Sequence, residues 1–250
     1  MVSFQIKLAE ISMRIHSIYR STMQFCSEYL TDETPKFEIE ITQKDIDEER
    51  IHSVHSSVQE GREVVHYTDA YLETLALYRK ITAKLIDFHV LLFHSSAVAV
   101  GGQVYLFTAK SGVGKTTHTK LWLRNIPNCH VLNGDKPLLL FRNDGIYVCG
   151  TPWQGKENYG TNEILPLKAL CVLERGKQNH IKQISFGVAF ATLMMQAHHP
   201  DAGAGVIQSI QLLKQFDRIK LYQLQCNMQD EAAFVSYKGM VENYDKQKIL

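Results

Sequence analysis

The chain has 250 residues, of which 45% are hydrophobic and 21% are charged, a composition that is ordinary for a globular protein and excludes a disordered or fibrous one. Its 27 Lys and Arg residues and 26 Asp and Glu residues give a net charge of +1, which argues against nucleic acid as a partner because phosphate neutralisation needs an excess of cations. The apolar runs are far shorter than the roughly 20 residues that cross a bilayer, so no membrane partner is expected.

Residues 1–88 are expected to form a small α+β region. Periodicity is weakest in the first 65 residues, where a short strand is predicted at 37–41 because apolar residues alternate with glutamates. The acidic stretch 42–50 is expected to lie at the surface. From 69 to 88, apolar residues recur at three- and four-residue steps, which predicts an amphipathic helix with Asp69 as its N-cap.

Strands and helices alternate over residues 89–250, which favours a second domain of the α/β class. A hairpin is predicted from strands at 90–100 and 103–108, because the glycines at 101 and 102 accept the positive φ angles of a tight turn. The remaining expected strands are 131–132, 137–142, 145–149, 167–173 and 219–225, and the expected helices are 114–124, 186–198, 202–217 and 229–242. The hairpins argue against a purely parallel sheet.

The segment 109–116, Ala-Lys-Ser-Gly-Val-Gly-Lys-Thr, lies between a predicted strand and a predicted helix. It matches the phosphate-binding Walker A pattern except at Ala109, where the pattern has glycine. Small residues let the backbone wrap a polyphosphate, and the positive end of the following helix adds to the attraction. Lys115 would bridge the β- and γ-phosphates of ATP, and the Thr116 hydroxyl would hold Mg²⁺. The predicted nucleotide-binding residues are Ser111, Gly112, Val113, Gly114, Lys115, Thr116 and Thr117.

Two polar residues outside the loop are further candidates for the reaction site. Asp135 follows the predicted strand 131–132 and could hold the metal opposite Thr116, or accept a proton from an attacking hydroxyl. The alternative is a turn aspartate before Lys-Pro. His94 falls inside the predicted strand 90–100 and could point to the sheet end where phosphates bind, although a lone histidine is more often structural.

Two other segments carry weaker signals. In the turn-rich segment 151–158, Lys156 could bind a phosphate while Trp153 stacks on a ligand, or the segment could be a surface loop with a packing tryptophan. The pair His198-His199 has no patterned carboxylate or cysteine beside it, so a helix C-terminus is favoured over a metal site.

The compartment is indicated by the cysteines and by the start of the chain. The five cysteines are scattered, odd in number and never in a Cys-x-x-Cys pair, which is typical of reduced thiols: Cys26, Cys129, Cys149, Cys171 and Cys226. Residues 1–14 lack a basic start followed by an apolar run and a small-residue cleavage site, so no secretory signal is expected. We predict a cytoplasmic protein.

His94, the Gly-Gly hairpin, the Ser-Gly-Val-Gly-Lys-Thr-Thr loop and the acid soon after it resemble the catalytic domain of HPr kinase/phosphorylase. The resemblance covers roughly residues 90–240, and the 21 residues from His94 to Lys115 are its specific link. It implies a mixed sheet flanked by helices, in a P-loop fold related to phosphoenolpyruvate carboxykinase. It also implies that Lys115 and Thr116 bind phosphates and Mg²⁺, and that His94 and Asp135 lie at the transferred group.

The sequence departs from the resembled family at one position. Asp135 matches the second member of an Asp-Asp pair, and Gly134 stands in place of the first, which leaves the general base unassigned. If the glycine records a lost base, Gly134→Asp should raise turnover by about tenfold. If it serves a backbone need instead, aspartate there should destabilise the fold.

The leading function is that of an ATP-dependent kinase, with ATP and Mg²⁺ as cofactors and catalytic roles for Lys115, His94 and Asp135. The acceptor would be a hydroxyl of a peptide, a small protein or a small molecule. The alternatives are a nucleotide-sensing protein without catalysis, favoured by Gly134, and a carboxykinase-like enzyme, which would need arginines such as Arg142 and Arg175. The acceptor, the donor (ATP or pyrophosphate) and assembly into a homo-oligomer stay open.

Overall fold

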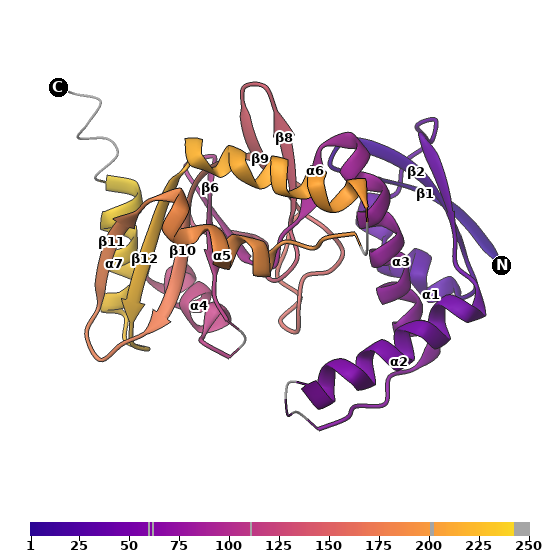
Figure 1. The fold of residues 1–250 in the computed structure, drawn as a ribbon, viewed down its shortest axis with the longest axis horizontal. Coiled ribbons are helices and arrows are strands. Elements are labelled where there is room, and N and C mark those ends of the chain that lie inside the picture. Colours follow the sequence, from indigo (N-terminus) through magenta and orange to yellow (C-terminus); the bar gives the residue numbers. More distant parts are fainter. Residues whose placement is uncertain (60, 62, 111, 201–202, 243–250) are drawn as a thin grey trace. The chain divides into compact units, whose positions relative to one another are not determined.

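The chain divides into two units, Met1–Phe88 and His89–Leu250, in a computed structural model (Figure 1). The structure describes residues 1–59, 61, 63–110, 112–200 and 203–242. Each unit builds its own sheet, of three strands in the first and nine strands in the described part of the second. Both units therefore combine helices with strands.

The first unit begins with a hairpin that the sequence analysis missed. Strand β1 (Val2–Leu8) pairs antiparallel with β2 (Ile11–Ser17), and β3 (Phe37–Glu40) pairs parallel with β2. The hairpin turns at Ala9 and Glu10, whose φ angles are 48° and 68°. Positive φ angles are typical of glycine or asparagine, so this pair gives no turn signal in the sequence. The expectation of weak regular structure over the first 65 residues is wrong.

The helices of the first unit correct one further expectation, the N-cap of the helix that begins at residue 69. They are α1 (Arg20–Phe25), α2 (Gln43–Gln59) and α3 (Asp69–Leu85), with 3₁₀ turns at Ser27–Tyr29 and Ile86–Phe88. The acidic stretch 42–50 is helical, because Thr42 and Asp45 bond to each other's backbone N–H in a capping box. The N-cap of α3 is Thr68, whose hydroxyl accepts from the Tyr71 N–H, and Asp69 pairs with Arg50 instead.

A buried carboxylate joins two elements of the first unit. Glu73 of α3 is fully buried. Its two oxygens accept hydrogen bonds from the backbone N–H groups of Ile18 at 2.5 Å and Tyr19 at 3.1 Å, and from the Thr22 hydroxyl. A buried charge is tolerated only when its lone pairs are satisfied. Glu73 therefore fixes the entry to α1 against α3.

The sheet of the second unit is mixed. Its strands follow the order β4-β8-β9-β10-β6-β5-β7, and β12 pairs with both β10 and β11. Strand β10 runs parallel to β6 on one side and to β12 on the other. The bounds are β4 (Val90–Leu92), β5 (Ser96–Val100), β6 (Gln103–Thr108), β7 (His130–Asn133), β8 (Leu138–Arg142), β9 (Gly145–Cys149), β10 (Ile164–Arg175), β11 (His180–Ile184) and β12 (Lys220–Cys226).

The predicted strand 90–100 is interrupted. β4 pairs with β8, whereas β5 pairs with β6 and β7, so the two halves occupy different places in the sheet. His94 lies in the break and not within a strand. Its backbone N–H donates to the Gln196 carbonyl at 2.8 Å, and the next N–H, of Ser95, donates to the Asp135 carbonyl at 3.1 Å.

Helix α4 (Lys115–Asn125) is anchored to this sheet by an aromatic cluster. Trp122 is fully buried and its ring contacts Phe107 of β6, with 5.1 Å between ring centroids, and Tyr237 of the C-terminal helix α7 (Glu231–Tyr237), at 5.7 Å. Its Nε1–H donates to the Ser236 hydroxyl at 2.7 Å. Burial of a Trp side chain contributes several kcal/mol. The contacts of Trp122 therefore hold α4 firmly against β6.

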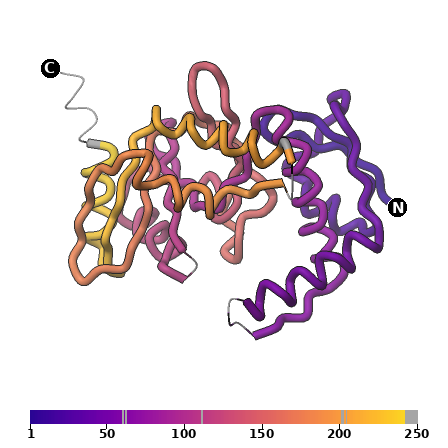
Figure 2. The backbone as a smooth tube through the Cα atoms, viewed as in Figure 1, coloured from indigo at the N-terminus to yellow at the C-terminus, as the bar shows by residue number. Residues whose placement is uncertain are grey.

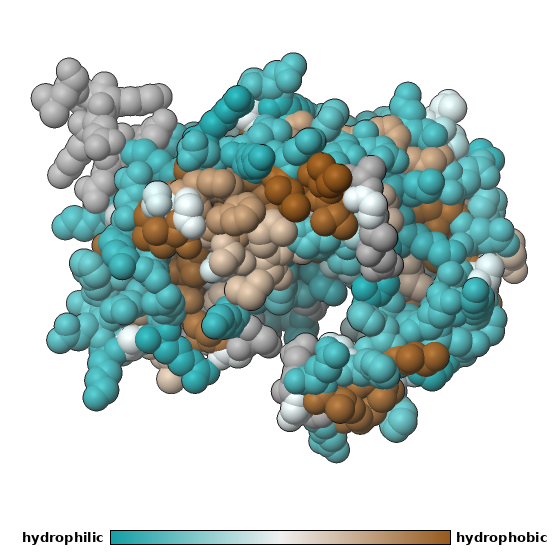
Figure 3. Space-filling view, in the orientation of Figure 1, coloured by the Kyte–Doolittle hydropathy of each residue, from teal (hydrophilic) through white to brown (hydrophobic). Residues whose placement is uncertain are grey.

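The remaining helices of the second unit are α5 (Phe186–Gln196), α6 (Ala204–Leu213) and α7 (Glu231–Tyr237), with a 3₁₀ turn at Lys214–Arg218 and a π turn at Lys238–Glu242. Helices α5 and α6 lie side by side (Figure 2). Val188, Met195 and Ile207 are 60–65% exposed on them, and Figure 3 shows apolar surface over these two helices. Among the described helices, none is long and apolar enough to span a membrane.

Candidate functional site

The loop between β6 and α4 turns on two glycines. Gly112 and Gly114 have φ angles of 77° and 125°, and the Val113 N–H donates to the Lys110 carbonyl at 3.2 Å. Glycine tolerates these angles at no steric cost. Ala109, the departure from the Walker pattern, has no positive φ among the described residues and is buried in the core, so glycine is not required there. Ser111 lies outside the described residues.

The N-terminus of α4 is open to a ligand. Its N-cap is Gly114, and no side chain caps it with a hydrogen bond. A Cβ added at Gly112 would meet nothing within 4 Å. The first N–H groups of a helix have no intrahelical partner and carry partial positive charge. Thr116 is exposed in the first turn, and Thr117 is half-buried. The loop therefore has room and donors for a phosphate group.

Three side chains predicted separately meet at this loop. The Nε2 atom of His94 lies 3.2 Å from the Nζ atom of Lys115 and 3.1 Å from an Oδ1 atom of Asp135. A single imidazole nitrogen either donates or accepts, so it cannot bond well to the ammonium and the carboxylate at once. The side chains of His94 and Asp135 are 41% and 31% exposed, so a ligand can reach them.

Burial and charge have different effects on the pKa values of Lys115 and Asp135. Burial lowers the pKa of Lys115 from its ordinary value, and the nearby Asp135 carboxylate only partly opposes the shift. Burial favours a higher pKa for Asp135, but the hydrogen bond with His94 and the nearby cationic groups outweigh it, so that pKa lies below its ordinary value. Asp135 is therefore ionised at neutral pH and available to a metal ion or a proton.

The backbone around Asp135 is fixed by neighbouring polar groups. The Asn133 side-chain oxygen accepts from the N–H of Asp135 at 2.9 Å and from that of Lys136 at 2.7 Å. The Ser96 hydroxyl donates to the Gly134 carbonyl at 3.0 Å. These bonds form an Asx turn, a local structure that the Asn-Gly-Asp sequence favours. The turn holds the carboxylate toward His94.

Gly134 is required by close backbone contact. Its φ angle is not among the positive ones, but an added Cβ would lie 2.5 Å from the Gln154 carbonyl oxygen and 3.3 Å from that of Tyr159. The Gly134 N–H also donates to the Tyr159 carbonyl at 2.9 Å. Any side chain here would collide with backbone atoms. A backbone requirement therefore explains the glycine, and a gain of turnover in Gly134→Asp is no longer expected.

The segment 152–160, which presses on Gly134, places its two candidate residues differently. Trp153 is 7% exposed, so its ring packs inside the protein and does not offer a stacking face to a ligand. Lys156 is exposed and follows Gly155, at which an added Cβ would lie 3.0 Å from the Asp135 Cβ. An ion pair of 3.0 Å between Glu157 and Lys120 ties the segment to α4. Lys156 thus lies on a segment that adjoins the site.

The other candidates do not form a second site. His199 bonds through Nδ1 to the Ser209 hydroxyl at 2.6 Å and through Nε2 to the Met194 carbonyl at 2.9 Å, which joins α5 to α6. Within the described ranges, no group of three or more His, Cys, Asp or Glu side chains is arranged to hold a metal ion. Arg142 lies 4.3 Å above the Tyr147 ring in the β8–β9 hairpin, whereas Arg175 contacts the Gly112 carbonyl.

Arg175 contacts the loop between β6 and α4, which the sequence analysis did not predict. It ends β10, and its Nη2 atom donates to the Gly112 carbonyl at 2.5 Å. Strand β10 runs parallel to β6, so both strands end at the same edge of the sheet. A second cation therefore adjoins the loop. No local pattern could have indicated it, because the two residues are 63 positions apart.

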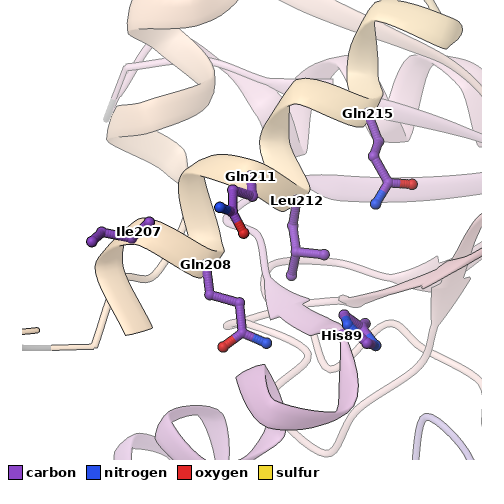
Figure 4. Close-up of a pocket in the computed structure, with 6 residues that line it drawn as sticks. All are labelled: His89, Ile207, Gln208, Gln211, Leu212 and Gln215. Atoms are coloured by element: carbon purple, nitrogen blue, oxygen red, sulfur yellow. The ribbon is translucent and has the colours of Figure 1, made fainter. Parts of the chain in front are cut away.

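Two cavities of similar size lie among the described residues of the second unit. One, of about 430 Å³, adjoins the loop and is lined by residues that include Gly112, Val113, Gly114, Thr117 and Arg175. The other, of about 490 Å³, is lined by His89 and by side chains of α6 and the turn after it (Figure 4). Its described lining has amides but no Lys, Arg or carboxylate: His89, Ile207, Gln208, Gln211, Leu212 and Gln215. Only the first cavity suits a polyphosphate ligand.

No family model and no curated protein matches the chain. Among solved structures, the chain is similar to the HPr(Ser) kinase/phosphatase from Coxiella burnetii, with 9% identity and a TM-score of 0.35, over 64% of this chain and 99% of that one. At these values the likeness identifies neither the family nor the function of the chain.

Proposed function

We propose that the second unit is a phosphotransferase domain that transfers the γ-phosphoryl group of ATP to a hydroxyl of a peptide, a small protein or a small molecule. The observation that carries the proposal is the contact of Lys115 and Asp135 with one nitrogen of His94, directly beside a glycine loop that opens an uncapped helix. Phosphoryl transfer needs chiefly positioning and neutralisation of charge. The loop amides and Lys115 supply both.

The ground-state cluster suggests how the side chains respond to a triphosphate. Lys115 is drawn to the β- and γ-phosphate oxygens, because an anion attracts its ammonium more strongly than a ring nitrogen of His94 does. The His94 Nε2 atom is then free to carry a proton and donate to Asp135. Arg175 stays on the Gly112 carbonyl and holds the loop.

The transfer step breaks one bond and forms another. The acceptor hydroxyl oxygen bonds to the γ-phosphorus, the bond from that phosphorus to the β,γ-bridging oxygen breaks, and ADP leaves with the electron pair. The hydroxyl proton passes to the Asp135 carboxylate and then to water. In a loose transition state the proton moves late, so a carboxylate of low pKa suffices. Mg²⁺ would neutralise charge on the phosphate oxygens, with Thr116 and Asp135 as the residues that hold it.

Calorimetric titration of the full chain with ATP and Mg²⁺ tests binding. Lys115→Ala should lower the affinity at least tenfold, since it removes a charge-assisted bond. Lys182→Ala is the matched control, because it removes the same charge from an exposed position of β11. Equal affinities in the two variants would refute the role of the loop.

A nucleotide-sensing protein without catalysis is the second candidate, favoured by the crowding at Gly134 that excludes a second acid. Release of ADP in the presence of serine peptides or small hydroxyl compounds distinguishes the two. ATP binding that Lys115→Ala weakens, but without ADP release that an acceptor stimulates, would favour sensing. Stimulation that is lost in Asp135→Asn would favour transfer.

A further inference from the structure

The cavity of about 430 Å³ beside the loop lies where three strands end. Strands β6, β10 and β12 are parallel neighbours, and the cavity is lined by the ends of β10 and β12, the loop after β6 and the first turn of α4. Ligands of open α/β sheets bind at such edges. Gly112, Val113 and Gly114 belong both to the loop between β6 and α4 and to the wall of the cavity, so the cavity continues directly from this loop. The remaining lining residues are Thr117, His118, Leu173, Arg175, Gly176, Cys226, Asn227 and Met228.

The walls of this cavity suit a flat aromatic group. Val113, Leu173 and Met228 supply apolar surface, and Met228 is 79% exposed at the rim. The guanidinium of Arg175 is planar and is held on the Gly112 carbonyl. Apolar side chains and a planar cation together bind the faces of a nucleobase better than they bind a sugar, which offers hydroxyls all round.

His118 lines the same cavity and has one polar atom without a partner. It is 2% exposed, and its Nε2 atom lies 3.0 Å from the Ser236 hydroxyl oxygen, whereas its Nδ1 atom is buried and makes no hydrogen bond. Burial lowers the pKa of His118 to about 4, so the ring is neutral and carries one proton. A buried polar atom without a partner costs free energy in a protein interior.

The bonds of Ser236 indicate which nitrogen carries that proton. Its hydroxyl accepts from the Trp122 indole N–H and donates to the carbonyls of the preceding helical turn, Ala232 and Ala233. A hydroxyl has one proton and two lone pairs, so its second lone pair accepts from His118 Nε2–H. The Nδ1 atom is then a bare acceptor, which is less costly to bury than an unpaired N–H.

We propose that this cavity holds the base of the nucleotide, and that the Nδ1 atom of His118 accepts a hydrogen bond from the 6-amino group of adenine. The inference rests on the proposed function, since the loop must hold the triphosphate. Guanine and hypoxanthine present a carbonyl oxygen at the same ring position, where one acceptor would face another. A bound adenine would supply the partner that Nδ1 lacks in the described structure.

The test compares four probes on the full chain: tripolyphosphate, ATP, purine riboside triphosphate (which lacks the amino group) and ITP. Tripolyphosphate reports on the loop alone, so failure of all four to bind would refute the proposed function. ATP should bind at least tenfold more tightly than tripolyphosphate and about fivefold more tightly than purine riboside triphosphate. The ratio of ATP affinity to ITP affinity should be larger than about fivefold. Binding of tripolyphosphate with equal affinity for the three nucleotides would overturn the inference and leave the loop proposal intact.

Two variants of His118 separate its two nitrogens. Asparagine can place an oxygen near the position of Nδ1, whereas glutamine can reach the Ser236 hydroxyl but leaves the Nδ1 position empty. His118→Asn should keep the preference for ATP over ITP, and His118→Gln should lose most of it while its melting temperature stays closer to that of the unaltered chain. A preference that both variants keep would contradict the assignment. The four-probe comparison needs no variant and decides the matter if neither folds.

Discussion

Substitution of Gly134 by alanine tests whether the turn before Asp135 is set by close backbone contact. The added methyl group would lie 2.5 Å from the Gln154 carbonyl oxygen, well inside ordinary contact distance, and 3.3 Å from that of Tyr159. Both neighbours are backbone atoms, so neither can move without shifting the segment 152–160. Overpacking of this kind costs about 1 to 3 kcal/mol. Because 1 kcal/mol shifts the melting temperature of such a domain by about 2 to 4 °C, we expect a fall of roughly 2 to 12 °C.

Gly187→Ala is the control for this measurement. Gly187 lies within α5, has no positive φ angle, and an added Cβ would meet only the Ser185 hydroxyl, at 4.0 Å. Alanine there should stabilise by about 0.5 to 1 kcal/mol because it restricts the unfolded chain. Thermal unfolding followed by circular dichroism compares the two. An unchanged melting temperature in Gly134→Ala, or a Gly134→Asp variant with intact stability and higher turnover, would refute the reasoning.

Three further predictions concern single side chains. Asp135→Asn should lower ATP affinity only when Mg²⁺ is present, and equal loss with and without the metal in calorimetry would make the residue structural. Because the folded state lowers the Asp135 pKa, its ionised form stabilises the fold above about pH 3.9 and loses that effect as pH falls further, so the variant should be destabilised at pH 7 and less so at pH 3 in urea unfolding. Arg175→Ala should weaken ATP binding about five- to tenfold with little change in melting temperature, since its guanidinium is exposed; a large loss of stability would contradict this. Glu73→Gln should cost about 1 to 3 kcal/mol in urea unfolding, because an amide NH₂ would face buried N–H donors, and an unaltered midpoint would refute it.

Elements with a strong local signal could be predicted from the sequence. The hairpin at Gly101-Gly102 has the expected turn and second strand, although its first strand begins only at Ser96, and the hairpin that turns at 143–145 has both expected strands. Glycine marks these turns and apolar residues mark the strands. The long apolar run 167–173 is the centre of β10, which has neighbours on both sides. In these cases the turn chemistry and the hydrophobic pattern agree.

The elements that the sequence analysis missed lack either a turn signal or a wide apolar face. The first hairpin turns on Ala9 and Glu10, which carry no turn propensity, although β1 and β2 alternate apolar and polar residues as strands do. Helix α2 buries little more than Ile46 and Glu49, so its apolar face is too narrow to be recognised. Its capping box, from Thr42 to Asp45, was the one available signal.

The candidate site also has a part that local sequence predicts and a part that only tertiary packing brings together. The loop was readable because its residue types and spacing are themselves the requirement for binding phosphate. That His94 and Asp135 lie at one site was implied by the family resemblance alone. Their contact could not be predicted from local sequence, because it depends on the break between β4 and β5 and on the order of strands in the sheet. Arg175 and His118 were missed for the same reason, since each reaches the cavity through tertiary packing.

A crystal structure of the chain with Mg²⁺ and a non-hydrolysable ATP analogue tests the central claim most directly. We expect the triphosphate to lie on the loop from Gly112 to Thr116, with the Lys115 ammonium moved from the His94 Nε2 atom to the β- and γ-phosphate oxygens. The γ-phosphate should face Asp135. A triphosphate bound elsewhere in the chain, or a Lys115 side chain that stays on His94 while the analogue is bound, would contradict the account.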